Sequence, residues 1–281
     1  MDEPGGRLPA VGVTGVGVAA IRAAESSRPD RLFDDPFAAR FVSAAGWNGT
    51  RGDPSRRRHL SAWIAVRTRF LDDVVLDACA GGCRQVVILG AGLDARSFRL
   101  RWPLGTNVWE LDLPSVLEFK ERVVRSEGWQ PSCRRRTVAV DLSGAWGQAL
   151  VDGGLDTEAP VAWLAEGLLA YLTEEIGDRI VSVAAELSVP GSRLGLTVAS
   201  PERLRAWRGA HPDGRAGPGD YVALWRSTGP EDPASWLASH GWEAAVYATA
   251  ERSMAYGRSV DEDGVSGGEW SGAGLVDATR R

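Results

Sequence analysis

Long apolar runs and cysteines are both scarce in this chain of 281 residues, and each scarcity excludes a class of protein. The longest apolar segments fall short of the roughly 20 residues that a membrane-spanning helix needs. The three cysteines are an odd number, and the opening Met-Asp-Glu-Pro-Gly-Gly has acid where a secretory signal needs base. We therefore expect a cytoplasmic protein with reduced thiols and no membrane span.

Excess positive charge and clustered metal ligands are absent as well. The formal net charge is −5, so no overall basic field attracts nucleic acid. The arginine runs 56–58 and 134–136 are interpreted as solvated surface. The three histidines are scattered, and Cys79 and Cys83 lack a second pair of ligands, so we expect no metal site.

The motifs of two common enzyme classes are either missing or lie outside the context that those classes require. The chain has no G-x-x-x-x-G-K-[ST] loop, which excludes a P-loop nucleotide hydrolase. Its G-x-S-x-G match at residues 264–268 lies in an expected loop and not between a strand and a helix, so we expect no nucleophile elbow and no α/β hydrolase. The function must therefore be sought in other patterns.

Short apolar runs alternate with helical patterns through the middle of the chain. The candidate strands are 85–89, 106–111, 136–140, 161–165 and 194–199, and the helical segments between them lie near 114–126, 144–151 and 173–187. This alternation predicts right-handed βαβ units in an α/β fold with a mostly parallel, doubly wound sheet. Outside it we expect helices at 14–25, 37–42, 59–79 and 233–240, and a terminal antiparallel pair of 243–249 with 275–279.

Two chemistry-bearing motifs follow the first two strands. Gly90-Ala91-Gly92-Leu93-Asp94-Ala95 fits G-x-G-x-x-A, in which glycine permits a tight turn and the close approach of a nucleotide-like ligand. Asp112 ends the next strand about 20 residues later, where a carboxylate can accept both hydrogens of a ribose diol. The alternative for Asp112 is an acid that stabilises the start of the helix at Pro114.

Three further groups lie at or near the same predicted edge. Asp141 can accept a hydrogen bond from an adenine amine while Leu142 offers an apolar face; the alternative is a cap between strand and helix. Glu166 ends the fourth strand at the edge where ligands of open α/β sheets bind, and the alternative is a capping or solvent-exposed glutamate. On the long helix before the first strand, Arg67 or Arg69 could offer a guanidinium to a ligand carboxylate.

In this order the motifs resemble the leucine carboxyl methyltransferase superfamily, and more closely its actinobacterial branch of S-adenosyl-L-methionine-dependent methyltransferases. The matching blocks are residues 20–26, 31–38, 66–70, 87–96, 109–114, 140–142, 163–172, 240–242 and 256–258. The resemblance implies a class I methyltransferase fold, with a doubly wound, mostly parallel, seven-stranded Rossmann-like sheet. It also implies a helical N-terminal cap over 1–83, a cofactor-binding core over 84–199, a substrate cap and sheet edge over 200–257, and a loop and last strand over 258–281.

The resemblance further implies S-adenosyl-L-methionine as cofactor and a role for each site residue. Arg69 would pair with the methionine carboxylate, Gly90 and Gly92 would pass under the methionyl part, Asp112 would hold the ribose, Asp141 and Leu142 would flank the adenine, and Glu166 would lie near the amino or sulfonium end. Glu166 and Tyr171 are the candidate catalytic groups. The expected reaction is methyl transfer to an oxygen of a small-molecule or carboxylate acceptor, in secondary metabolism.

The acceptor itself does not carry over from the family. The family often has methionine where this chain has Ala170 and threonine where it has Ala95, and the smaller Ala170 widens the acceptor side. We expect a small-molecule substrate and neither nucleic acid nor membrane as partner. The sequence leaves open whether the chain forms an oligomer with itself or with another protein.

Three rival functions remain open. A nicotinamide oxidoreductase also carries G-x-G-x-x-A and a downstream acid, although about 84 residues of mostly helical pattern precede the first strand here. A protein of the same fold could catalyse cyclisation or elimination without methyl transfer. The third is a non-catalytic subunit of a larger assembly.

Overall fold

The computed structural model describes residues 10–47, 49, 54–199, 204–205, 208–209, 221–227, 229–258 and 274–281. Its α-helices are α1 (Ala10–Ser26), α2 (Ala38–Ala44), α3 (Pro54–Ala80), α4 (Arg96–Arg99), α5 (Pro114–Glu127), α6 (Trp146–Asp152), α7 (Glu174–Glu186), α9 (Pro233–Ser239) and α10 (Thr249–Ala255). Its strands are β1 (Gln85–Leu89), β2 (Asn107–Asp112), β3 (Arg134–Ala139), β4 (Val161–Ala165), β5 (Arg193–Val198), β6 (Trp242–Ala248) and β7 (Gly274–Arg280). Two short 3-10 helices complete the description, η1 (Leu169–Tyr171) and η2 (Tyr221–Leu224).

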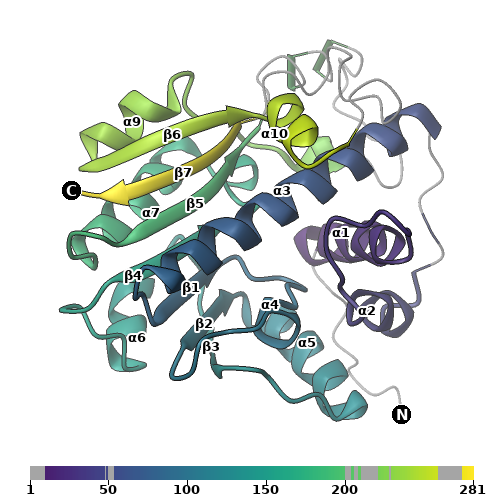
Figure 1. The fold of residues 1–281 in the computed structure, drawn as a ribbon, viewed down its shortest axis with the longest axis horizontal. Helices are drawn as coiled ribbons and strands as arrows, with labels where there is room; N and C mark the ends of the chain where they lie inside the picture. Colours follow the sequence, from purple (N-terminus) through teal and green to yellow (C-terminus); the bar gives the residue numbers. More distant parts are fainter. Residues whose placement is uncertain are drawn as a thin grey trace.

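The strands form one seven-stranded sheet in the order β3-β2-β1-β4-β5-β7-β6. The first five strands are parallel, and β7 runs antiparallel to both β5 and β6. Strand order reverses between β1 and β4, so the chain moves outward through β2 and β3 before it returns to β4 (Figure 1). In open α/β sheets, ligands bind beyond the carboxyl ends of the strands at such a reversal.

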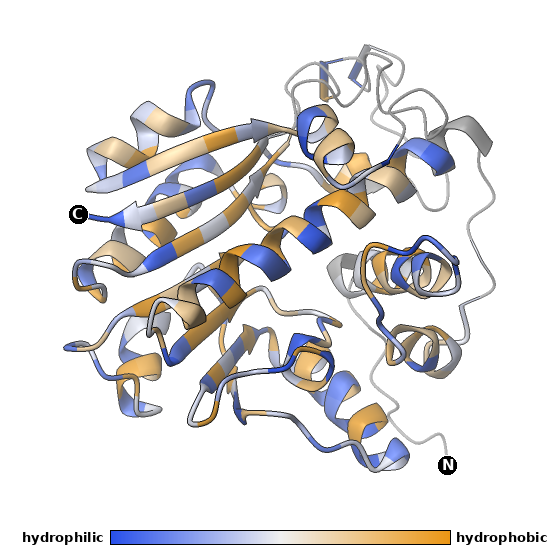
Figure 2. Cartoon of the chain, viewed as in Figure 1, coloured by the Kyte–Doolittle hydropathy of each residue, from blue (hydrophilic) through white to orange (hydrophobic). Residues whose placement is uncertain are grey.

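Helices cover both faces of the sheet because its central strands carry apolar side chains on both faces. In β1, Val86 and Ile88 pack in one buried cluster with α3, whereas Val87 and Leu89 pack in another with α6 and α7. A strand buried on both faces is typical of a parallel sheet between two helical layers. Helix α3 crosses one face in Figure 1, and Figure 2 shows its alternating hydrophobic and hydrophilic residues.

Helices α1 and α2 lie side by side and pack over the turn that follows β1 (Figure 1). Val16 of α1 and Phe41 of α2 share a buried cluster with Leu93 of that turn. Asp35 begins α2 by accepting hydrogen bonds from the backbone N–H groups of Phe37 and Ala38, at 3.2 and 3.1 Å. The helical cap formed by α1 and α2 therefore packs directly against the turn after β1, at the candidate ligand-binding edge.

The doubly wound α/β prediction is confirmed, and the expected strands differ from the observed ones by one or two residues at their ends. Short helices α4 and α10 were not expected, because four to seven residues are too few for a clear period. Residues 259–273 of the expected loop, and most of residues 200–231 in the expected substrate cap, lie outside the described residues.

The interpretation of the arginine run 134–136 as solvated surface is wrong for its middle member. The Arg135 side chain is 8% exposed, and its guanidinium donates to the buried carboxylate of Glu110 in β2 at 2.7 Å. Its neighbours Arg134 and Arg136 are exposed. Because successive side chains of a strand point to opposite faces, one arginine of the three is turned inward.

Candidate active site

The predicted site residues of the strands lie at one edge of the sheet, next to one another. Leu89 pairs with Leu111, so Gly90 follows β1 level with Asp112 at the end of β2. Asp112 in turn pairs with Ala139, and Asp141 follows two residues beyond it. Glu166 directly follows β4, on the other side of β1. Parallel pairing thus brings together residues that are up to 76 positions apart.

The glycine turn after β1 is shaped by two residues of positive φ. Gly90 has φ +62° and Gly92 has φ +47°, a region that costs an L-residue about 1–2 kcal/mol. A Cβ on Gly90 would lie 2.8 Å from a methyl carbon of Leu168, so Leu168 packs directly against this glycine. A Cβ on Gly92 would meet only the carbonyl oxygen of Gly90, at 3.9 Å. The open side of the turn is therefore at Gly92.

Asp112 holds this turn in place. Its Oδ2 accepts the backbone N–H of Gly92 at 2.6 Å, and its Oδ1 accepts that of Leu113 at 2.7 Å. Burial raises the pKa of Asp112, and these two hydrogen bonds oppose that rise. Asp112 is half-buried and lies beside the open side of the turn. A carboxylate that accepts hydrogen bonds from a ribose diol has to be accessible in this way.

Asp141 and Leu142 form the turn that follows β3. The backbone N–H of Ser143 donates to Asp141 Oδ1 at 2.8 Å, and that of Gly144 donates to the Asp141 carbonyl at 2.8 Å. The Asp141 side chain is exposed, and its hydrogen bonds with Ser143 lower its pKa. Leu142 is buried in the same cluster as Trp146. This turn offers an ionised acceptor next to an apolar side chain.

Glu166 lies in a set of buried ion pairs. Its Oε1 accepts from Arg22 at 2.8 Å and from Arg67 at 3.0 Å, and its Oε2 accepts from Arg96 at 2.7 Å. Burial alone raises the pKa of Glu166, but these three guanidiniums outweigh burial and hold that pKa well below its usual range. The side chain is 6% exposed. A carboxylate held in this way stays ionised and is a poor proton acceptor.

The ion pairs of Glu166 continue into the cap and the glycine turn. Arg96 also pairs with Asp72 at 2.7 Å and with Asp94, and Arg99 pairs with Asp72 at 2.6 Å. Among the described residues, this set contains as many guanidiniums as carboxyl groups. The guanidiniums belong to Arg22, Arg67, Arg96 and Arg99, and the carboxyl groups belong to Asp35, Asp72, Asp94 and Glu166. Buried charges require such pairing, because an unpaired one costs several kcal/mol.

The structure separates the two arginines that the sequence left as alternatives. Arg67 contacts Glu166, whereas Arg69 donates to Asp73 at 2.8 Å and to the carbonyl of Leu32 at 3.2 Å. The Arg69 guanidinium also lies over the ring of Tyr256. Residues two apart on a helix point in nearly opposite directions, so only one arginine of the pair can face the strand ends. The structure does not bring Arg69 to the edge that holds the other site residues.

Sequence reasoning assigned no role to Arg22, Arg96 or Asp94, although each touches Glu166 or a partner of Glu166. Arg22 and Glu166 are 144 residues apart, so no local spacing connects them. The one available signal was their presence in the blocks that resemble the methyltransferase family.

Tyr171 lies in η1, directly after the turn that carries Glu166 and Leu168. The backbone N–H of Arg226 donates to the carbonyl of Ala170 at 2.7 Å, so the segment after η2 rests on this turn. Tyr171 is half-buried and lies near enough to Arg67 to interact with its charge. Ser227 of the same segment also donates from its hydroxyl to the carbonyl of Leu169, at 3.4 Å.

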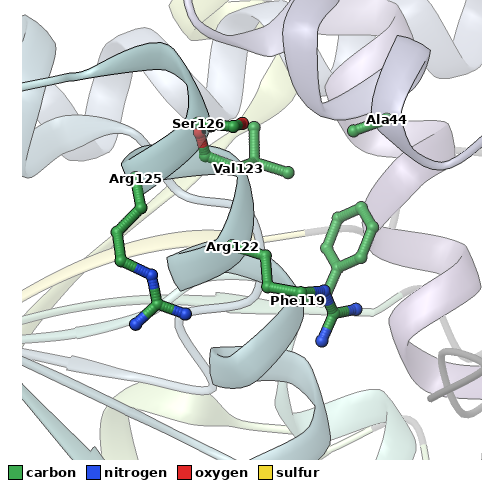
Figure 3. A pocket seen from close by; sticks show the side chains of 6 residues that line it. All are labelled: Ala44, Phe119, Arg122, Val123, Arg125 and Ser126. Carbon is green, nitrogen blue, oxygen red and sulfur yellow. Dashed lines mark hydrogen bonds between the residues drawn. The ribbon is translucent and has the colours of Figure 1, made fainter. Parts of the chain in front are cut away.

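A separate surface hollow lies between α2 and α5, away from the strand ends (Figure 3). Its lining includes the buried side chains of Phe119 and Val123 and the exposed arginines Arg122 and Arg125. None of the predicted site residues lines it. In the described part of the chain, no cluster of three or more histidine, cysteine or acidic side chains is suited to a metal, and no helix is long and apolar enough to cross a membrane.

Comparison with known protein sequences agrees with the geometry. The family model described as leucine carboxyl methyltransferase matches residues 15–185. A protein of Streptomyces coelicolor that carries the name of an S-adenosyl-L-methionine-dependent methyltransferase is 45% identical over 96% of each chain. A protein of Mycobacterium tuberculosis with the same kind of name is 41% identical over 90% of this chain and 86% of its own.

Comparison with solved structures supports the fold. A DUF574 family protein from Streptomyces avermitilis superposes with a TM-score of 0.57 at 17% identity, covering 94% of this chain and 97% of its own. Magnesium protoporphyrin IX methyltransferase from Synechocystis, with bound S-adenosylhomocysteine, gives a TM-score of 0.51 at 15% identity over 86% of this chain and 94% of its own. Both structures share the α/β fold of this chain. The match to the leucine carboxyl methyltransferase model and the named relatives speak against the nicotinamide-binding alternative.

Proposed function

Because the chain belongs to the leucine carboxyl methyltransferase family and is an S-adenosyl-L-methionine-dependent methyltransferase, we propose that it methylates an oxygen atom of a small molecule in secondary metabolism. The observation that carries the site assignment is the position of Arg67. Its Nε is fixed by Glu166, while its two terminal nitrogens have no hydrogen bond within the described part of the chain. A guanidinium held at one end and open at the other is arranged to receive a ligand carboxylate.

In this proposal Arg67, rather than Arg69, takes the methionine carboxylate of the cofactor. The Arg67 side chain is 11% exposed, and in this proposal its terminal nitrogens are the part that meets the ligand. Glu166 is a positioning residue in this arrangement, because it fixes the orientation of Arg67 and Arg22. This role replaces direct contact of Glu166 with the reacting atoms.

The adenosine half of the cofactor fits the turns after β1, β2 and β3. The space beside Gly92 admits the ligand where any side chain would intrude, and Asp112 lies beside it as the ribose acceptor. Asp141 receives the exocyclic amine of adenine, and Leu142 covers one face of the ring. Gly90 is covered by Leu168, so the methionyl part runs past Leu168 toward Arg67.

The bound cofactor supplies a sulfonium methyl that is already activated, so the residues of this chain need to position the acceptor and exclude water. Glu166 stays ionised and paired, so it does not serve as the general base. A carboxylate acceptor needs no base. Tyr171, in the 3-10 helix after β4, is the polar group that we assign to orienting the acceptor oxygen.

Two measurements test the proposal in sequence. Isothermal titration of the full chain with S-adenosylhomocysteine should give binding in the micromolar range, and Arg67→Met should weaken it. The chain is then incubated with methyl-labelled S-adenosylmethionine and a panel of small carboxylic acids and phenols, and methyl esters and ethers are sought by mass spectrometry. Absence of binding refutes the site, whereas binding with label found only on nitrogen or sulfur refutes the oxygen acceptor.

A further inference from the structure

Arg179 on α7 reaches across to the turn that carries Asp141 and Leu142. Its guanidinium donates a hydrogen bond to the backbone carbonyl of Ser143, the residue whose own N–H donates to Asp141. Ser143 is therefore held twice: its carbonyl accepts from Arg179, and its N–H donates to the Asp141 carboxylate. No motif in the sequence singles out this arginine, because Arg179 and Ser143 are 36 residues apart.

The charge of Arg179 acts on the same carboxylate. After the hydrogen bonds from Ser143, the positive charge of Arg179 contributes to the lowered pKa of Asp141. Asp141 is exposed, so water screens this effect and the contribution is small. The direct hydrogen bond to the backbone is the larger influence on where the turn lies.

Helix α7 lies between two parts of the candidate site, the segment that carries Tyr171 and the turn that carries Asp141. It begins three residues after Tyr171, and Arg179 lies on its second turn. Apolar contacts of Ile180 anchor this helix in the core beneath the sheet edge. Arg179 is itself exposed, but the packed helix that carries it fixes the position of its backbone relative to the turn.

We propose that Arg179 is a positioning residue for adenine recognition, which fixes the turn so that the Asp141 carboxylate faces the exocyclic amine of the base. This inference rests on the proposed cofactor site. An amine at this position donates to Asp141, whereas the carbonyl of hypoxanthine presents an oxygen that the carboxylate repels. Arg179 thus contributes to the selectivity for adenine over hypoxanthine without touching the cofactor.

The selectivity gives a test that separates positioning from general support of the fold. Isothermal titration is performed on the wild-type chain, Arg179→Gln and Arg179→Lys, with S-adenosylhomocysteine and with S-inosylhomocysteine, which carries hypoxanthine. One lost hydrogen bond predicts binding of S-adenosylhomocysteine about threefold to tenfold weaker in Arg179→Gln, with little change for the inosine compound. Arg179→Lys keeps a charged donor and should recover part of the preference.

Arg125→Gln is the matched control, because Arg125 is an exposed arginine near the end of α5 and away from the strand ends. It should bind both compounds as the wild type does. Equal weakening of both compounds in Arg179→Gln, or no change in either, overturns the inference while leaving the proposed function intact. A wild-type chain that binds neither compound overturns the proposed function and this inference with it.

Discussion

Replacing Glu166 with glutamine tests the buried ion pairs that organise the candidate site. The substitution keeps the shape of the side chain and removes its charge, so Arg22, Arg67 and Arg96 lose the carboxylate that they share. The amide oxygen can accept on one side only, and the amide nitrogen then faces a guanidinium donor on the other. Removing one partner of a buried ion pair costs about 3–5 kcal/mol.

This cost predicts a large change in thermal unfolding. At about 2–4 °C per kcal/mol for a domain of this size, Glu166→Gln should lower Tm by about 6–20 °C in differential scanning calorimetry. Glu118→Gln on the exposed face of α5 is the control and should stay within about 0.5 kcal/mol of the wild type. Equal Tm values for the two variants would refute the view that Glu166 bears three ion pairs.

The pH dependence gives a second check with a definite sign. The folded-state pKa of Glu166 is depressed, so its ionised form stabilises the fold at pH values above the unfolded pKa, which is about 4.3. That stabilisation is lost as the pH falls through the lower folded value. The difference in unfolding free energy between wild type and Glu166→Gln should therefore be constant near neutral pH and shrink below about pH 4.3. A difference that grows on acidification contradicts the assignment.

Four further predictions concern the cofactor site and the glycine turn. Arg67→Met should weaken S-adenosylhomocysteine by about 10- to 100-fold in titration calorimetry, but not 5′-methylthioadenosine, which lacks the carboxylate. Arg69→Met should lower Tm and leave both affinities unchanged, and the opposite result would restore Arg69 as the carboxylate ligand. Gly90→Ala should destabilise the chain by about 1–3 kcal/mol in urea unfolding, because its Cβ meets Leu168 at a positive φ; a variant of wild-type stability contradicts the packing. Burial raises the pKa of Asp112, so affinity for S-adenosylhomocysteine should fall on acidification at a higher pH than an ordinary aspartate gives, and Asp112→Asn should abolish that pH dependence.

Much of the fold was predictable because parallel strands have a strong local signature. The apolar run 85–89 was expected as a strand buried on both faces, and β1 has those bounds. The predicted strands also placed Gly90, Asp112 and Asp141 correctly, because each of these residues lies at or just after the end of a strand. Short helices such as α10 were missed because their formation depends on contacts with α3 and β6 rather than on a period.

The sequence by itself determined which residue types stand at the ends of the strands, because local patterns of apolar residues locate the strands and therefore their ends. Only the tertiary structure decided which charges meet. It joined Arg22 of the cap to Glu166 across 144 residues, turned Arg67 inward and Arg69 away, and set Arg179 against the turn after β3. The physical reason is that a buried charge takes whichever partner the packing of distant helices brings within hydrogen-bonding distance, and that packing leaves no mark on local spacing.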